Sequence, residues 1–276
     1  MSCKSIIAAT AFVVASCCFS GASAAPAKRV RSAPAPAAAQ PDNALSAYFR
    51  KDVPTLTAMA EAGNAAAQYN LGVMYAKGQG VSQDYAAAVS WYRKAADQGY
   101  AGAQNNLGLM YAKGQGVSQD YAAAAGWFRK AADQGYADAQ NNLGVMYDNG
   151  TGVAQDYAAA VSWYRKAADQ GYAFAQFELG KMYAKGQGVP QNNAVAAGWF
   201  QTAADQGLVD AQRVLGLIYS LGEGVAQDYV QAHKWFNLAA ASGNADAVKN
   251  RDKVASLMTP AQIAEAQRLA SAWRKR

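Results

Sequence analysis

The feature that most constrains the fold is a tryptophan that recurs every 36 residues, at Trp91, Trp127, Trp163, Trp199 and Trp235. Residues 64–99 and 100–135 are identical at 29 of 36 aligned positions. Four glycine positions keep the same period and account for 20 of the 25 glycines in this 276-residue chain. A period of about 20 to 50 residues is typical of solenoids and other repeat arrays. The sequence therefore predicts five tandem repeats over residues 64–243.

Each repeat is predicted to be a pair of helices. In the first repeat, apolar spacing indicates a helix over Ala65–Lys77, which ends at Gly78 because glycine tolerates left-handed backbone. Asp84 is expected to cap the second helix by accepting backbone N–H bonds. Gly72 lies inside the first helix, where glycine costs about 1 kcal/mol relative to alanine. Its recurrence in all five repeats predicts that two helices approach closely there.

The predicted fold class is all-α. Short links between helices favour antiparallel neighbours, so the pairs should stack as a solenoid with capping helices at both ends. We expect residues 44–63 to form an N-terminal half-repeat and residues 244–276 to form a C-terminal cap. Thr259, Pro260 and Gln262 have the spacing of a helix start with a capping box.

The N-terminus has the pattern of an export signal. Lys4 precedes an apolar stretch over residues 6–19, and Ala22, Ser23 and Ala24 are small residues suited to cleavage. We therefore expect residues 1–24 to be a signal peptide and the mature chain to be exported, with the periplasm as its predicted location. A short membrane anchor is an alternative. Residues 25–43, rich in alanine and proline, are expected to form an extended linker.

The segment ending at Cys17 also resembles a bacterial lipobox, and lipidation there would make the protein an outer-membrane lipoprotein. Secretion into the medium is a further alternative for its location. All three cysteines, Cys3, Cys17 and Cys18, lie in the predicted signal. The predicted mature chain therefore has no thiol for disulfides, metal binding or nucleophilic catalysis.

The net charge of +6 does not indicate nucleic-acid binding. Seven of the 25 lysines and arginines lie in the leader, the linker and the last three residues. The remaining chain has 18 basic residues against 19 acidic ones and is close to neutral. A nucleic-acid site requires clustered positive charge, so we expect no nucleic-acid partner.

The repeats resemble a known family. The pattern Ala67-Gln68-x-x-Leu71-Gly72-x-x-Tyr75, followed by Ala88-x-x-Trp91-Tyr92-x-x-Ala95-Ala96, resembles the Sel1-like repeat, a relative of the tetratricopeptide repeat. This resemblance implies a right-handed αα superhelix that serves as a scaffold or adaptor for protein complexes. Some secreted, cysteine-rich members have been linked to penicillin binding or weak β-lactamase action. The repeats here have no cysteine, so that activity is not carried over.

No constellation of residues predicts catalysis. The single histidine, His233, has no second candidate ligand near it in sequence, and a lone helical histidine is more often a packing residue. The Gly-Gln-Gly turns lack the Lys-Ser/Thr of a phosphate loop. We expect the recurrent tryptophans to lie in the core. The sequence thus predicts a non-enzymatic chain with no cofactor and no metal.

Comparison of the repeats with one another locates a candidate binding face. Several positions of the first helix vary between repeats, and at about 100° per residue they fall within one arc. The candidate partner-binding residues in this arc are Tyr69, Asn70, Asn105, Asn106, Asn141, Asn142, Phe177 and Arg213. Asparagine both donates and accepts hydrogen bonds, which suits an extended peptide on a concave face. Neutral drift on a solvated face is the alternative explanation.

We therefore expect a scaffold or adaptor of the bacterial cell envelope that binds a protein or peptide whose identity the sequence does not specify. One alternative is a secreted effector that binds a host protein. Another is an envelope hydrolase that acts on β-lactams.

Overall fold

The computed structural model describes residues 44–45, 47–48 and 52–274. The predicted signal peptide, the linker and Cys17 lie outside these residues. Contacts within the chain group its residues into two units, with the boundary after Pro36. Every described residue belongs to the second unit, Ala37–Arg276. All regular secondary structure in the described part is helical.

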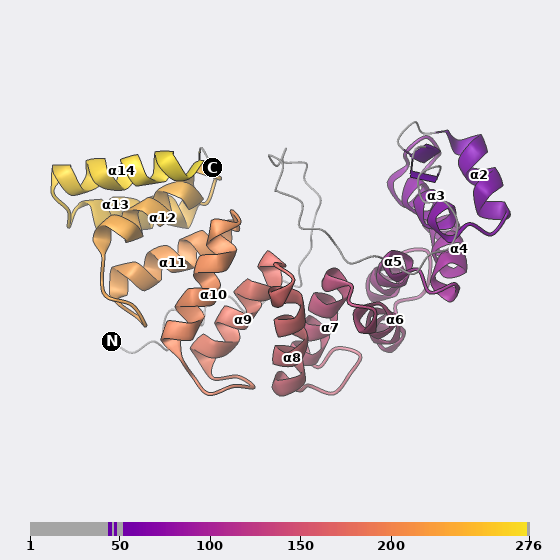
Figure 1. Ribbon diagram of the computed structural model, residues 1–276, viewed down its shortest axis with the longest axis horizontal. Coiled ribbons are helices and arrows are strands. Elements are labelled where there is room, and N and C mark those ends of the chain that lie inside the picture. Colours follow the sequence, from indigo (N-terminus) through magenta and orange to yellow (C-terminus); the bar gives the residue numbers. More distant parts are fainter. Residues whose placement is uncertain (1–43, 46, 49–51, 275–276) are drawn as a thin grey trace. The chain divides into compact units, whose positions relative to one another are not determined.

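Five helix pairs occupy the predicted repeats (Figure 1). The first helices of the pairs are α3 (Ala65–Lys77), α5 (Ala101–Lys113), α7 (Ala137–Asn149), α9 (Ala173–Lys185) and α11 (Val209–Leu221). The second helices are α4 (Tyr85–Asp97), α6 (Tyr121–Asp133), α8 (Tyr157–Asp169), α10 (Asn193–Asp205) and α12 (Tyr229–Ala241). The remaining helices are α2 (Val53–Glu61), α13 (Ala245–Ala255) and α14 (Pro260–Arg274).

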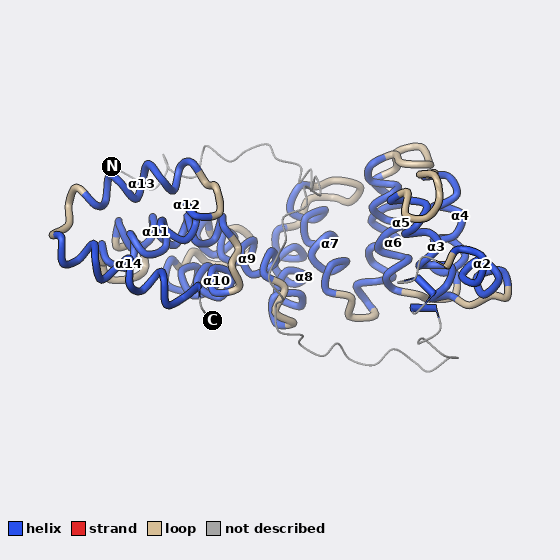
Figure 2. Tube along the Cα trace, turned by 90° about the horizontal axis from the view of Figure 1, so that it is seen from above, coloured by secondary structure: helices blue, strands red, loops and turns tan. Residues whose placement is uncertain are grey.

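Each helix from α2 to α12 packs on the next helix in the chain, and α14 packs on α12. Figure 2 shows the pairs following one another along this unit, with α13 and α14 beside α12. This arrangement is a helical solenoid, as predicted. Thr259 and Gln262 form the expected capping box at the start of α14, since Thr259 N donates to Gln262 Oε1 at 2.8 Å and Gln262 N donates to Thr259 Oγ1 at 3.3 Å.

The predicted helix ends are confirmed. Asp84 Oδ1 accepts a hydrogen bond from Ala87 N at 3.0 Å. The equivalent caps are Asp120, Asp156, Asn192 and Asp228, each of which accepts from a backbone N–H in its first turn. Gly78 ends α3 with φ +64°, in the left-handed region that favours glycine. Repeated caps and stops therefore define the helix boundaries in every repeat.

Gly72 marks the predicted close helix contact. A Cβ atom there would lie 2.7 Å from the ring of Tyr92, which is too close for a real carbon contact. The other repeats pair the same glycine with Phe128, Tyr164, Phe200 or Phe236. A helical glycine thus lets an aromatic ring of the second helix lie close against the first.

In the second to fifth repeats, the second glycine of the turn contacts the preceding repeat. Gly116 has φ +72°, and a Cβ there would lie 2.3 Å from the Tyr85 carbonyl oxygen of the preceding repeat. The turn of one repeat therefore packs against the start of the previous second helix. This contact requires glycine for both backbone conformation and space.

The five tryptophans pack on the hydrophobic core, as expected, but four of them are not fully buried. Trp235 is buried, with 1% of its surface exposed, but the other four are only partly buried. The Lys94 ammonium lies 4.0 Å from the centre of the Trp91 ring, and Lys130 and Lys166 cover their tryptophans at 3.9 and 3.8 Å. An indole ring can pack on one face and attract a cation to the other. The periodic spacing predicted that one face of each indole ring packs on the core. It gave no information about what covers the other face of the ring.

A buried glutamine joins three helices in successive repeats. Gln104 Nε2 donates to the Ala96 carbonyl of the preceding repeat at 3.1 Å. Its Oε1 accepts from Gln134 Nε2, at the end of α6, at 2.7 Å. We call this arrangement the glutamine pair. It occurs in the first four repeats, as Gln68 with Gln98, Gln104 with Gln134, Gln140 with Gln170, and Gln176 with Gln206.

Candidate binding surface

The eight candidate residues lie on the first helices of the five repeats and differ in accessibility. Asn70, Asn105 and Asn141 are buried, with 8%, 5% and 9% of their surface exposed. The half-buried candidates are Tyr69, Asn106, Asn142, Phe177 and Arg213. A partner can therefore reach these five side chains more readily than the three buried asparagines.

The asparagines use part of their hydrogen-bonding capacity within the chain. Asn142 Nδ2 donates to Asn105 Oδ1 at 3.0 Å, which links α7 to α5. Asn70 Nδ2 is 3.5 Å from the Ala44 carbonyl oxygen. Asn141 Oδ1 is buried and accepts no hydrogen bond from the described residues. These amides thus support the packing between repeats as well as lining the candidate surface.

Sequence reasoning missed a set of tyrosines at the starts of the first helices. Tyr100, Tyr136 and Tyr172 occupy the N-cap positions of α5, α7 and α9 and form no side-chain cap. In the first repeat the same position is Asn64, whose Oδ1 accepts from Ala67 N at 2.8 Å. The signal that could have identified them is a tyrosine directly after the repeat-ending glycine in three successive repeats.

One of these tyrosines contacts a candidate residue, and another contacts two residues of neighbouring first helices. The rings of Tyr69 and Tyr100 have centroids 5.0 Å apart. The Tyr172 hydroxyl donates to Asp138 Oδ1 at 3.1 Å, and its ring lies 5.9 Å from that of Phe174. Tyr100 and Phe174 are 37% and 51% exposed. We define the aromatic row as Tyr69, Tyr100, Tyr136, Tyr172 and Phe174.

Three tyrosines of this row, Tyr69, Tyr100 and Tyr136, stay protonated at neutral pH because their pKa values are raised. Burial raises the pKa of Tyr69 above its ordinary value, and the nearby Tyr100 hydroxyl adds to the effect. Burial is also the main cause of the raised pKa of Tyr136, with a further contribution from the Asp138 carboxylate. Neutral phenols present both a hydroxyl donor and an apolar ring. The surface therefore suits recognition by mixed polar and apolar contacts.

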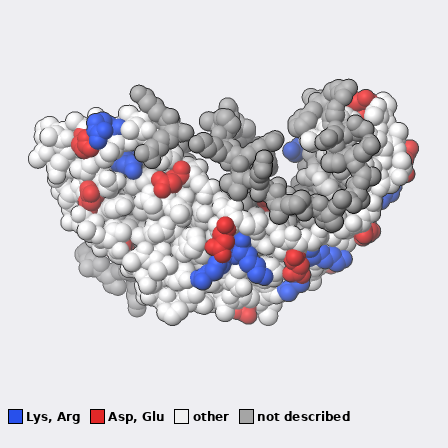
Figure 3. Space-filling model, in the orientation of Figure 1, with Lys and Arg blue, Asp and Glu red and all other residues white. Residues whose placement is uncertain are grey.

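Arg213 and Phe177 lie further along the chain. The Phe177 ring packs against that of Phe200 at 5.4 Å, so it also belongs to the core of its repeat. Glu178, beside it, pairs with Lys181 at 2.5 Å. Charged side chains of both signs are interspersed over the visible face in Figure 3. No single-sign patch on that face provides the electrostatic footprint that nucleic acids require.

The described residues include no group of three or more His, Cys, Asp or Glu side chains that could hold a metal ion. His233 is 3% exposed, and burial lowers its pKa, with the neighbouring Arg251 adding to the effect.

None of the helices that the structure describes has the length and apolarity needed to span a membrane. The described residues as a whole form a helical repeat protein.

Comparisons with known proteins identify the family. The family model of the Sel1 repeat matches residues 65–100, 101–136, 137–172, 173–208 and 209–244. The chain therefore belongs to the Sel1 repeat family. Proteins of this family generally mediate protein–protein interactions, and the family is generally non-enzymatic. No curated protein matches the chain.

Two solved structures are similar along most of the chain. One is c5321 of uropathogenic Escherichia coli, a protective antigen with an SLR fold, at 39% identity and a TM-score of 0.74. That match covers 82% of this chain and 52% of the E. coli protein, so the chain spans about half the length of that relative. The other is a Sel1 repeat protein from Oxalobacter formigenes, at 36% identity, a TM-score of 0.70, and coverage of 75% of this chain and 87% of that one.

Proposed function

We propose that this chain is a non-enzymatic scaffold of the bacterial cell envelope that binds a segment of a partner protein on its first helices. The observation that carries the proposal is the aromatic row beside the half-buried amides of Asn106 and Asn142. Tyrosine and asparagine together supply apolar area and adaptable hydrogen bonds, as they do in antibody binding sites. The general role of Sel1 repeats in protein–protein interaction supports this assignment.

The envelope location is part of the proposal and depends on the sequence of residues 1–24. The apolar stretch and the small residues before Ala25 support export and cleavage. Mass spectrometry of the N-terminus of the mature protein separates the two processing routes. Ordinary cleavage leaves Ala25 first, whereas lipidation leaves a modified Cys17.

The binding surface is tested by affinity capture, with crosslinking, of the full chain from the native envelope. Tyr100→Ala combined with Asn106→Ala should reduce recovery of the partner about tenfold, because both side chains are accessible on the proposed surface. Ser162→Ala is the matched control, since Ser162 is exposed on the second helix α8. Equal recovery from both variants, with unchanged melting temperatures, would sink the proposal.

The two alternatives make different predictions. A secreted effector would appear in the culture medium rather than in the envelope fraction, which cell fractionation measures. A hydrolase acting on β-lactams would turn over a chromogenic β-lactam, and we expect no turnover above that of the buffer.

A further inference from the structure

The fifth repeat lacks one member of the glutamine pair. The first four repeats place a glutamine Nε2 group 2.7 Å from a buried glutamine Oε1. In three of them the same Nε2 also lies 3.2 or 3.3 Å from the lysine carbonyl one turn earlier in the helix. One –NH2 group therefore bridges two acceptors in these repeats. In the fifth repeat, Ser242 occupies the position of that glutamine.

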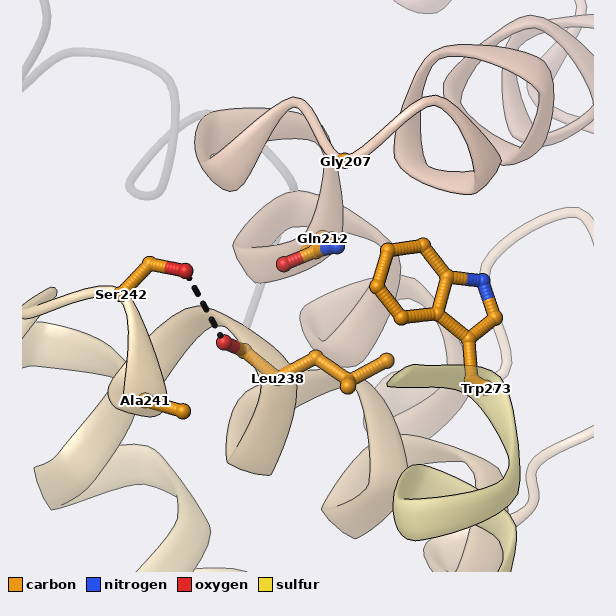
Figure 4. Close-up of a pocket in the computed structure, with 6 residues that line it drawn as sticks. All are labelled: Gly207, Gln212, Leu238, Ala241, Ser242 and Trp273. Carbon is orange, nitrogen blue, oxygen red and sulfur yellow. Dashed lines mark hydrogen bonds between the residues drawn. The ribbon is translucent and has the colours of Figure 1, made fainter. Parts of the chain in front are cut away.

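This replacement leaves one buried acceptor without a donor. The Ser242 hydroxyl is too short to reach Gln212 and contacts the Leu238 carbonyl oxygen at 3.4 Å (Figure 4). Gln212 Nε2 donates to the Ala204 carbonyl at 3.3 Å, so the amide orientation is set and its Oε1 points away from that contact. Gln212 is 2% exposed, and its Oε1 accepts no hydrogen bond from the described residues. A buried acceptor without a donor is unfavourable.

A cavity lies at this position. It has a volume of about 360 Å³ and is lined by Gly207, Gln212, Leu238, Ala241, Ser242 and Trp273 (Figure 4). Trp273 comes from α14 and packs edge-on against Trp235 at 6.3 Å. The volume falls at the small end of the range of about 300 to 1,000 Å³ that is usual for ligand sites. The replacement of glutamine by serine and the cap helix together form a site that the other repeats do not have.

We propose that this cavity binds a primary carboxamide. The –NH2 group of the ligand takes the position that a glutamine side chain fills in the other repeats and donates to Gln212 Oε1 and the Leu238 carbonyl. Its hydrocarbon part lies against the Trp273 ring. A carboxylate has no N–H to donate to these two oxygens. An ammonium group would lose its hydration without a carboxylate in the lining to compensate.

The ligand chemistry is tested with propionamide as the probe. A fragment of this size binds weakly, so binding is followed by NMR of the Gln212 side-chain amide and the Trp273 indole in the full chain. Propionamide should shift both signals in a saturable way. N,N-Dimethylpropionamide and propionate, which lack the –NH2 donor, should not. Equal shifts from all three probes would overturn the proposal, as would a propionamide-soaked crystal with only water at Gln212 Oε1.

Three substitutions connect binding to the cavity. Ser242→Gln should supply the missing side chain, raise the melting temperature and abolish binding. Ser242→Ala leaves the cavity, Gln212 Oε1 and the Leu238 carbonyl in place, so it should retain binding. It is the control for a general effect of changing Ser242. Gln212→Leu should abolish binding while keeping the fold. Retained binding in folded Ser242→Gln or Gln212→Leu protein would contradict the assignment.

The source of the amide is decided by a second comparison. If the ligand is a side chain of a partner protein, the peptide Gly-Gln-Gly should bind at least tenfold more tightly than propionamide, and Gly-Glu-Gly should not bind. If the ligand is a free small amide, the peptide should bind no better than propionamide. Both results support a carboxamide site, and binding of Gly-Glu-Gly as tight as that of Gly-Gln-Gly would overturn it.

Discussion

Gln134 Nε2 donates a hydrogen bond to Gln104 Oε1 at 2.7 Å, and Gln104 Nε2 in turn donates to the Ala96 carbonyl of the preceding repeat. Gln104 is 5% exposed, so its amide obtains both hydrogen bonds from within the protein. The pair connects two repeats through the end of a helix, where backbone carbonyls have no partner in the helix itself.

Gln104→Ala should lower the free energy of unfolding by about 2 kcal/mol, because two hydrogen bonds of a buried side chain are lost and a cavity remains. Gln134→Ala should cost less, about 1 kcal/mol, since Gln134 is exposed and water can reach the orphaned oxygen. Urea unfolding of both variants and of the double variant measures the coupling between the two residues. We expect the pair to show a coupling energy of about 1 kcal/mol. Strict additivity would show that the two side chains do not interact.

Two glycines in neighbouring helices should respond oppositely to alanine. A Cβ at Gly108 would lie 2.7 Å from the Phe128 ring, so Gly108→Ala should destabilise the fold by about 1–3 kcal/mol through overpacking. Gly126, in α6, is exposed and has nothing within 4 Å of the added carbon. Gly126→Ala should therefore stabilise the fold by about 0.5–1 kcal/mol through helix propensity. Thermal unfolding checks both, and a stabilising Gly108→Ala would contradict the close packing.

The aromatic row predicts a loss of stability in alkali. Burial raises the pKa values of Tyr69, Tyr100 and Tyr136 in the folded state. The contribution of the neutral tyrosines to stability is complete below their pKa of about 10 in the unfolded chain. Above that pH the unfolded chain ionises first, so the free energy of unfolding falls as pH rises. Urea unfolding at a series of pH values measures this fall. Tyr136→Phe should reduce its slope, and an unchanged slope would contradict the assignment.

His233 predicts a loss of stability in acid. Burial and the neighbouring Arg251 lower its pKa, so the unfolded chain takes up a proton first as pH falls below about 6.5. His233→Val, which introduces the residue found at Val89 and Val161, should remove this dependence. The titration of the imidazole is followed directly by NMR in the folded wild-type protein. A midpoint at or above the value of an exposed histidine would contradict the burial.

Sequence periodicity predicted the helices of the repeats because the same local signals occur in each one. Asp84 marks the start of a helix and Gly78 marks an end, and each acts through contacts within a few residues of chain. Gly72 was more informative, because a recurrent helical glycine has few explanations besides close approach of another helix. Local rules repeated five times therefore determine most of this fold.

The candidate surface was harder to predict, because it depends on contacts between repeats. Variation at Asn105 and Asn141 indicated an exposed face, but packing of the adjacent repeats buries both side chains. Tyr136 is the reverse case. Tyrosine occupies this position in three successive repeats, as a purely structural residue would, but the side chain belongs to the aromatic row. The cavity beside Gln212 could not be predicted from spacing alone, because it requires Trp273 of the cap helix.

The measurement that tests the central claim most directly is site-specific photocrosslinking in living cells. A photoreactive phenylalanine analogue replaces Phe174, which is 51% exposed in the aromatic row, or Leu257, which is 59% exposed between α13 and α14. The two sites are matched in exposure and apolar character and differ in the surface that they sample. We predict a crosslinked partner from position 174 and none from position 257. The same partner at equal yield from both positions, or a partner from position 257 alone, would contradict binding through the first helices.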